Sequence, residues 1–401
     1  MLTAQGKPGY SQDPSLAASL PSLLPVHRTS YFDLRAWEKP AAGTLRNLAA
    51  STSQAAASPS PAHRVLRQRG DWLRSSLYFP DDTVGWVPFA LLRALELHFA
   101  HPFDLVYTSS PPRSAPLIGY LLKRFLGLRW VAEFRDPWYL SPRPFRSRAD
   151  AWLLRCLLRR ADRVVVISEG HAEELERAHG LRPDHLAIIS NGFDEGDFQP
   201  EPPPFHPAFA AGFIHLSHFG AVYPRFSGNF FRALAEVLQE QPEARRRLRV
   251  NIVGFPDETC LRYAQENALG DVVKIHDFMG HSESLQAMAA SRCLLLFLAN
   301  KQVSRLSGLG KIYWYLRVGR PILAVASEGG TKNLVEAGQA GWVVEPEDTE
   351  GLKGVLRQLL RQEWNGSPPR PLRPEFVSQF RYDRLVEKLA RTLSEVAVRG
   401  R

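Results

Sequence analysis

A lysine and a pair of glycines, two elements apart, carry the clearest chemistry in this chain. Lys311 begins the amphipathic segment Lys-Ile-Tyr-Trp-Tyr-Leu-Arg-Val, which stops at Gly319, and a buried strand then leads into Glu328-Gly-Gly-Thr331. This loop is predicted to open a helix at about Asn333, whose N-terminus presents free N–H groups and a positive dipole end. The lysine adds a mobile positive charge. The pattern therefore predicts a site for an anionic group, with a surface helix cap as the alternative role of Lys311. The candidate residues are Lys311, Glu328, Gly329, Gly330 and Thr331.

Two further loops follow predicted strands in the same half of the chain. Phe219-Gly-Ala-Val-Tyr-Pro-Arg225 comes directly after a buried strand, and a glycine at that turn lets the backbone approach a ligand. His281 stands just before a predicted helix, where a ligand contact and a helix cap are both open. The candidates from these loops are Gly220, Tyr223, Arg225 and His281.

A carboxylate lies at the end of a buried strand in the N-terminal half. Phe134-Arg-Asp-Pro-Trp138 follows the strand Trp130-Val-Ala-Glu-Phe134, and ligands of open α/β sheets bind outside the carboxyl ends of the strands. A positioned carboxylate can take a proton from a hydroxyl group, so Asp136 is a candidate base. The alternative is that Asp136 caps a turn and pairs with Arg135, which would lower its pKa and make it a poor base.

Strands and helices alternate along both halves, which is typical of doubly wound parallel sheets. The N-terminal half predicts strands at 104–108, 130–134, 163–167 and 185–189, and helices at about 115–125 and 149–160. The C-terminal half predicts strands at 214–219, 249–253, 272–275, 293–298 and 321–326, with helices between them and a last helix at about 382–397. We therefore expect an α/β fold of two Rossmann-like domains that face a cleft, with the last helix packing back on the first domain.

The stretch Gln199-Pro-Glu-Pro-Pro-Pro204 is a stiff linker and predicts a domain boundary. We expect a first domain at 1–198, a second domain at 205–375 and a C-terminal helix within 376–401. Residues 41–62 are rich in Ala, Ser and Pro, and this composition predicts a mobile loop.

The composition, 44% hydrophobic and 23% charged over 401 residues, is that of a soluble protein with room for two domains. The three cysteines are widely spaced and form no CxxC pair, which favours buried free thiols and a reducing cytoplasm. No apolar run reaches the roughly 18–20 residues that span a bilayer. The N-terminus lacks the pattern of a signal peptide. We expect a cytoplasmic protein without a transmembrane anchor.

The excess positive charge is confined to the first part of the chain. Residues 1–163 hold 22 Lys and Arg against 12 Asp and Glu, whereas the remaining residues hold 28 against 29. Between 123 and 160 the basic residues are interleaved with large aromatic residues, a mixture that suits an anionic membrane surface. It also suits nucleic acid, and a solvated helix face above a tryptophan-containing core is a further alternative. We expect peripheral contact with the inner face of the membrane and no nucleic-acid partner.

Five segments, taken in their order along the chain, resemble the GT-B glycosyltransferases of the family-4 kind. They are Thr108-Ser-Ser-Pro-Pro-Arg-Ser114, Ala132-Glu-Phe-Arg-Asp-Pro-Trp138, Val166-Ile-Ser-Glu169, Ser190-Asn-Gly-Phe-Asp194 and the Lys311 helix with its glycine loop. The resemblance covers nearly the whole chain. It implies a nucleotide-diphosphate-sugar donor on the second domain, a hydroxyl of a glycan or lipid-linked acceptor on the first, and retention of configuration. It implies no cofactor and no metal ion, because a lysine can offset the charge on the departing diphosphate.

The same resemblance assigns roles to the candidates. Asp136 and Lys311 would be catalytic, and the loops that contain Gly220 and Glu328 would bind the donor. The acceptor-side residues would be Ser109, Ser110, Arg135, Asp136 and Trp138.

The chain departs from the family in two places. Leu306 and Trp314 stand where the family has two glutamates eight positions apart, which removes from the nucleotide ribose a charge-assisted hydrogen bond of about 1.5–3 kcal/mol. The chain also starts at Leu2-Thr-Ala-Gln, which resembles the end of the family's second strand. We expect either a start placed too far downstream or a truncated form that leaves strand edges unpaired.

Two other functions stay open, because a fold alone does not fix an activity. One is an isomerase or hydrolase of nucleotide-sugars with the same fold, which would need additional carboxylates and histidines. The other is a catalytically weak relative that acts as a binding or assembly partner. Trp314 and Leu306 favour the second, while Lys311 and the glycine loop oppose it.

Overall fold

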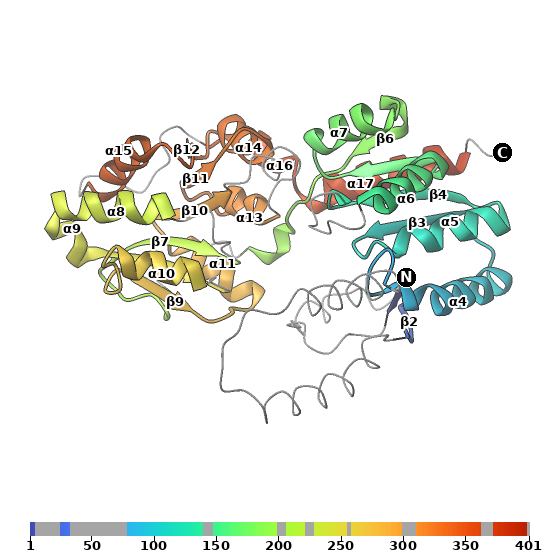
Figure 1. Cartoon of the computed structure of the whole chain (residues 1–401), viewed down its shortest axis with the longest axis horizontal. Helices are drawn as coiled ribbons and strands as arrows, with labels where there is room; N and C mark the ends of the chain where they lie inside the picture. The colour runs from blue at the N-terminus through green and yellow to red at the C-terminus, as the bar shows by residue number, and fades with distance from the viewer. Residues whose placement is uncertain are drawn as a thin grey trace, which may run out of the picture. The chain divides into compact units, whose positions relative to one another are not determined.

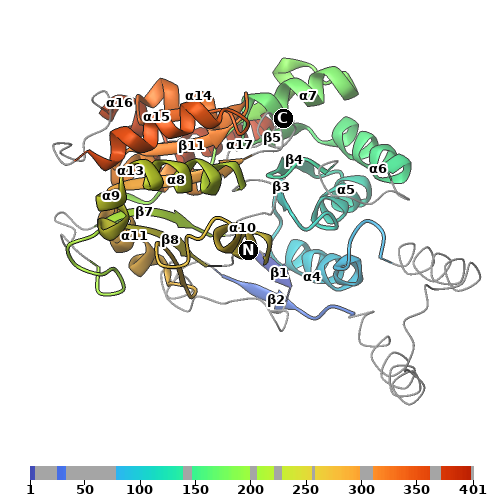
Figure 2. The same cartoon turned by 60° about the vertical axis from the view of Figure 1, so that its left-hand side comes forward.

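The computed structural model describes residues 1–4, 25–32, 78–138, 147–198, 206–220, 228–254, 258–298, 310–361 and 372–398 (Figures 1 and 2). The chain divides into two compact units. The first comprises Met1–Val165, His179–Ala187 and Thr392–Arg401, and the second comprises Val166–Ala178 and Ile188–Arg391. Each unit is built on an α/β sheet, which confirms the predicted fold class. The segments 41–62 and 199–204, predicted as a loop and a linker, lie outside the described residues.

The first unit contains a four-stranded sheet with the order β3-β4-β5-β6. Its strands are Leu105–Ser110, Arg129–Phe134, Arg163–Val166 and Leu186–Ile188. Trp130, Val131 and Ala132 in β4 are inaccessible to solvent, as expected for a strand with both faces covered. Helix α5 (Ala115–Leu126) packs on β3 and β4, and its amphipathic sequence ends at Gly127 in the left-handed conformation that favours glycine. The strands and helices predicted for this half are therefore confirmed.

Two helices of this half were not predicted. Helix α4 (Val87–Ala100) packs on α5. Helix α7 (Glu169–His179) follows β5. A separate parallel pair, β1 (Leu2–Ala4) with β2 (His27–Thr29), packs against α4. Helix α6 (Ser147–Arg160) matches the predicted helix.

The second unit contains a six-stranded parallel sheet with the order β12-β11-β10-β7-β8-β9. In chain order the strands are Ile214–Phe219, Leu248–Val253, Val273–His276, Cys293–Leu298, Ile322–Ala326 and Gly341–Val344. The first and fourth of these have the bounds that the sequence predicted. The last strand, β12, was not predicted. Its sequence, Gly-Trp-Val-Val, is too short to show a period.

Helices cover both faces of this sheet. One face carries α8 (Gly228–Glu240), α10 (Glu258–Glu266) and α15 (Thr349–Leu360), with Phe230 and Phe231 of α8 fully buried. The other carries α11 (His281–Ala289), α13 (Lys311–Val318) and α14 (Gly330–Gly338). The short helices α9 (Pro242–Arg247) and α16 (Pro374–Ser378) complete the unit. Helix α14 starts three residues before the predicted Asn333, because Gly329 already serves as its N-cap.

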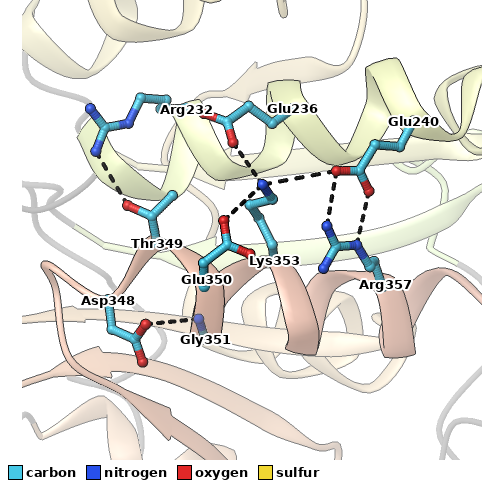
Figure 3. Close-up of polar contacts among 9 residues, drawn as sticks. All are labelled: Arg232, Glu236, Glu240, Asp348, Thr349, Glu350, Gly351, Lys353 and Arg357. Atoms are coloured by element: carbon cyan, nitrogen blue, oxygen red, sulfur yellow. Dashed lines mark hydrogen bonds and ion pairs between the residues drawn. The ribbon is translucent and has the colours of Figure 1, made fainter.

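An ion-pair network joins α8 to α15 in the second unit (Figure 3). The Lys353 ammonium lies 2.9 Å from carboxylate oxygens of both Glu236 and Glu350. Arg357 forms a two-pronged contact with Glu240, each N···O distance being 2.9 Å. Since the two helices also pack closely in this region (Figure 1), the network fastens α15 to its neighbour.

The final helix, α17 (Tyr382–Val398), contributes to both units. At its start, the Tyr382 N–H donates to the Phe193 carbonyl, and the Phe193 N–H donates to the Phe380 carbonyl. From Thr392 onward the helix belongs to the first unit, where Glu395 pairs with Arg163 at 3.1 Å.

Candidate functional site

The sheet of the second unit reverses its strand order between β7 and β10. Strands β8 and β9 extend from one side of β7, whereas β10, β11 and β12 extend from the other. Ligands of open α/β sheets bind outside the carboxyl ends of the strands at such a reversal. Backbone pairing of β7 with β10 joins Leu216 to Cys293 and Ser217 to Leu294, and beyond this point side chains connect the two strands.

Two side chains on one face of helix α13 bind the end of β7, and one of them also reaches β10. The Tyr315 hydroxyl accepts a hydrogen bond of 3.1 Å from the Phe219 N–H and lies 3.5 Å from the Leu295 carbonyl oxygen. Lys311, one turn earlier on the same face, donates to the Phe219 carbonyl. Both backbone polar groups of the last β7 residue are therefore bound by α13. Tyr315 is fully buried, and this burial raises its pKa above the usual range.

The Lys311 ammonium has backbone and imidazole partners instead of a carboxylate. Its Nζ lies 3.2 Å from His218 Nε2, and His218 Nδ1 lies 3.0 Å from the Leu295 carbonyl oxygen. Within the described ranges, no carboxylate lies within ion-pair distance of Lys311. Burial lowers the pKa of Lys311 to about 8. The ammonium therefore bonds at the end of β7 and is not a surface cap of its own helix.

One glycine leaves room for this ammonium, and a second glycine leaves room for the first. Gly220 follows β7 with φ +95°, and a Cβ atom there would lie 3.0 Å from Lys311 Nζ. Gly254 follows β8 with φ +114°, and its Cβ would lie 3.3 Å from the Gly220 Cα. The left-handed conformation and the close approach both require glycine. The predicted Gly220 and Lys311 are thus neighbours, while Tyr223 and Arg225 lie outside the described residues.

The Gly-Gly loop borders a cavity. Gly329 and Gly330 line a pocket of about 790 Å³ together with Ser190 and Tyr313. Thr331 is fully buried, and its Oγ1 has no hydrogen-bond partner within the described ranges. The exposed Glu328 is engaged by Lys332, one turn into α14. Of the four loop residues, the glycines therefore face the cavity and Glu328 lies at the surface.

His281 lies beside Trp314. The two rings meet edge to face with centroids 5.0 Å apart, and His281 Nε2 lies 2.8 Å from a carboxylate oxygen of Asp197. Trp314 is half-buried against the core on that face of the sheet. One turn on, Arg317 binds both carboxylate oxygens of Glu195 and holds the pKa of that carboxyl below its usual range. Leu306, the other departure from the family pattern, lies outside the described residues.

The acceptor-side candidates of the first unit gather at the ends of β3 and β4. The Arg135 N–H donates to the Ser110 carbonyl at 2.8 Å, and the Trp138 indole N–H donates to the Ser110 hydroxyl at 3.3 Å. Ser109 donates to the carboxylate of Glu133. Trp138 is buried, so its ring belongs to the core.

Asp136 is exposed, whereas Pro137 and Trp138, which follow it, are buried. The side chain of Arg135 is also exposed. Within the described residues 78–138, no ion pair joins it to Asp136. The ion pair between Arg135 and Asp136 is therefore not formed. The structure brings Ser110, Arg135 and Trp138 together by hydrogen bonds and leaves Asp136 as an exposed carboxylate after β4.

Sequence reasoning missed two residues of this site, His218 and Tyr315. Tyr315 lies four positions after Lys311, a spacing that places both on one helix face. His218 lies two positions before Gly220, so its place near a ligand loop was visible although its partner was not.

Within the described ranges, no helix has the length and apolarity needed to cross a bilayer. The same residues hold no cluster of three or more His, Cys, Asp or Glu side chains suited to a metal ion.

Two protein-family models together match most of the chain. Residues 41–192 match the glycosyl transferase 4-like domain, and residues 218–362 match the glycosyl transferases group 1 family. The second match contains Gly220, Lys311 and the Gly-Gly loop.

Among curated proteins, the chain is similar to D-inositol 3-phosphate glycosyltransferases. That of Streptomyces scabiei is 28% identical over 216 residues, which cover 50% of this chain and 46% of the relative. That of Streptomyces coelicolor is 28% identical over 223 residues, which cover 50% and 48%. The chain thus spans about half the length of the curated relatives it matches.

Solved structures share the fold. The Anabaena protein HepE, solved in complex with UDP, aligns with a TM-score of 0.58 and 20% identity over 78% of this chain and 84% of its own. Sucrose-phosphate synthase of Thermosynechococcus elongatus aligns with a TM-score of 0.54 and 16% identity over 77% and 78%.

Proposed function

The chain belongs to the GT-B glycosyltransferases of group 1, and on that premise we propose that it moves a sugar from a nucleotide-diphosphate-sugar to a hydroxyl of a glycan or lipid-linked acceptor. The transfer retains the configuration of the sugar and needs no metal ion. The donor binds on the second unit, and the acceptor hydroxyl is received by residues of the first.

The observation that carries this proposal is the Lys311 ammonium at the strand reversal. When the bond between the sugar and the diphosphate breaks, negative charge develops on the departing phosphate oxygen. An ammonium fixed next to that oxygen stabilises the transition state more than the ground state. With its pKa lowered by burial to about 8, Lys311 is mostly charged at neutral pH, and a bound diphosphate raises that pKa again.

On the acceptor side, the exposed Asp136 carboxylate is the group proposed to take the proton of the attacking hydroxyl. Its neighbours hold the loop in place, because Trp138 and Arg135 both bond to Ser110.

A second candidate function is a catalytically weak relative that binds a nucleotide-sugar and serves as an assembly partner. Trp314 favours it, because an aromatic ring replaces a carboxylate that would accept hydrogen bonds from the ribose. An isomerase or hydrolase is less well supported, because the described surroundings of the Lys311 ammonium contain His218 but no paired carboxylate.

A thermal-shift series with UDP-, GDP- and ADP-linked sugars tests the proposal. A ligand at 100 times its dissociation constant should stabilise the protein by about 2.7 kcal/mol. Stabilisation together with release of nucleoside diphosphate in the presence of an acceptor supports the enzyme. Stabilisation without turnover supports the binding partner, and no stabilisation by any donor contradicts both.

We also propose that the first unit binds an anionic membrane surface at the inner face of a membrane. On α6, Trp152 is 64% exposed and shares one helix face with the exposed Arg148, Arg155 and Arg159. A tryptophan at the headgroup level with arginines around it suits anionic lipid.

Vesicle binding tests this second proposal. Arg155→Gln should weaken binding to vesicles with anionic lipid about fivefold, which corresponds to about 1 kcal/mol per charge. Arg262→Gln, an exposed arginine of the second unit, is the matched control and should change little. Equal binding to neutral vesicles at low and high salt would contradict the proposal.

A further inference from the structure

We propose that His218 is a positioning residue, whose neutral imidazole orients the Lys311 ammonium over Gly220 toward the phosphate groups of the donor. This inference rests on the proposed function for its ligand. The contact between His218 and Lys311 is measurable without any ligand, so the two can fail separately.

The position of the imidazole is fixed by its surroundings. His218 is buried within β7, with only 1% of its surface accessible, and its ring centroid lies 5.2 Å from that of Phe297. Nδ1 lies 3.0 Å from the Leu295 carbonyl oxygen, which can only accept, so Nδ1 carries the proton. Nε2 then has a free electron pair, and it faces Lys311 Nζ at 3.2 Å. The backbone of β10 thereby sets the tautomer that Lys311 meets.

Two fixed acceptors determine how the ammonium is oriented. An ammonium has three N–H donors. One donates to the Phe219 carbonyl and a second to His218 Nε2, and no other acceptor in the described ranges is bonded to Lys311. The third N–H is left for a ligand, and its direction follows from the other two. Burial lowers the pKa of Lys311, and no carboxylate within the described ranges offsets this effect.

Asparagine and glutamine provide a matched pair of variants. The amide nitrogen of asparagine can take the place of Nδ1, so His218→Asn keeps a donor for Leu295 but loses the acceptor for Lys311. The longer glutamine can place an amide oxygen near the position of Nε2, so His218→Gln keeps the acceptor and loses the donor. If His218 only holds β7 to β10, His218→Asn should behave more like the wild type. If His218 positions Lys311, His218→Gln should behave more like the wild type.

The first measurement is nuclear magnetic resonance of the wild-type protein without ligand, with nitrogen-15 in histidine and lysine. We expect His218 to be neutral with its proton on Nδ1. We expect the Lys311 pKa to fall in His218→Asn and to stay near the wild-type value in His218→Gln, because only asparagine removes a partner of the ammonium. A proton on Nε2 in the wild type would overturn the proposal whatever the variants do.

The second measurement is calorimetric titration of the three proteins with UDP and with GDP, together with kcat and KM for the donor sugar that the screen identifies. For whichever nucleotide binds the wild type, His218→Asn should bind about tenfold more weakly, the loss expected for a hydrogen bond to a charged group. His218→Gln should remain within about threefold. The alkaline limb of the pH profile of kcat/KM should move to lower pH in His218→Asn only.

Equal losses in both variants, or a larger loss in His218→Gln, would overturn the positioning role. If neither nucleotide binds the wild type, the proposed function fails. The proton position on His218 and the Lys311 pKa in the variants would still decide the contact itself.

Discussion

Two lysines of the second unit are held in opposite ways. Lys353 on α15 lies 2.9 Å from carboxylates of both Glu236 and Glu350, and these partners raise its pKa (Figure 3). Lys311 on α13 is held by a backbone carbonyl and an imidazole, and burial lowers its pKa to about 8. The charge of Lys353 is already balanced within the chain, so its contacts fasten two helices. The charge of Lys311 has no carboxylate partner among the residues that the structure describes.

The largest effect should come from removing the unbalanced charge. Lys311→Ala should lower turnover by on the order of a hundredfold, because the departing phosphate loses its stabilising ammonium. The melting temperature should change little, since no ion pair within the described ranges is lost. Steady-state kinetics and a melting curve measure both. Lys332→Ala, which removes a paired lysine from α14, is the control and should keep its turnover. Unchanged turnover in Lys311→Ala would refute the assigned role.

Trp314→Glu adds a carboxylate three positions after Lys311, on the helix whose lysine has no carboxylate partner within the described ranges. If the family alignment of this helix holds, the new carboxylate should accept hydrogen bonds from the nucleotide ribose and tighten donor binding by up to about a hundredfold. The melting temperature should fall, because a half-buried ring that packs against the core and His281 is lost. Calorimetric titration beside a melting curve measures both. A variant of wild-type stability that binds no better would show that the alignment of this segment is wrong.

Acid should weaken the second unit through the buried His171 and His215 and the half-buried His276, which form no ion pair within the described ranges. Burial lowers the pKa of His171 to about 4 and also lowers the pKa values of His215 and His276. The folded state thus binds fewer protons than the unfolded state, so this stability is complete above about pH 6.5 and is lost as the pH falls toward 4. His171 alone should contribute a loss of about 2 kcal/mol between pH 7.5 and pH 5. Denaturant titrations at both pH values test this, and His171→Leu should show the smaller pH dependence. An equal dependence in that variant would exclude His171 as a cause.

The smallest effect should come from Lys353, whose charge is balanced by Glu236 and Glu350. Lys353→Met should lower the melting temperature by roughly 2–4 °C and leave turnover unchanged, because the network of α8 and α15 is lost but the donor site is intact. The difference from wild type should shrink at high salt, since exposed carboxylates are screened. A loss of turnover as large as that of Lys311→Ala would remove the distinction between the two lysines.

The sequence predicted the elements whose signals are local. Strand β10 is an uninterrupted apolar run, and Gly319 ends α13 in the left-handed conformation. The start of α14 was placed three residues late, because a glycine N-cap lacks the side chain that usually marks a helix start. Helix α15 was missed although Asp348 caps it by accepting from the Gly351 N–H.

The site was predicted only in part, because some of its residues follow local sequence patterns and others depend on long-range contacts. Lys311 and Gly220 belong to recognisable strand-loop-helix patterns, so their types and positions were informative. His218 and Tyr315 act through contacts with residues 93 and 96 positions away, which follow from the strand order of the sheet and not from any local pattern. Ser109, Ser110 and Trp138 were predicted near Asp136, but their hydrogen-bond partners became visible only in the fold.

The binding of Phe219 by α13 gives the protein a built-in reporter. Its amide hydrogen is bonded to a phenol oxygen of a helix, in contrast to most amides of a sheet, which are bonded to a neighbouring strand. Exchange of this hydrogen with deuterium therefore requires α13 to lift from β7, and the same movement withdraws the Lys311 ammonium from Gly220. The exchange rate of one amide thus reports the fraction of molecules in which the lysine is in place.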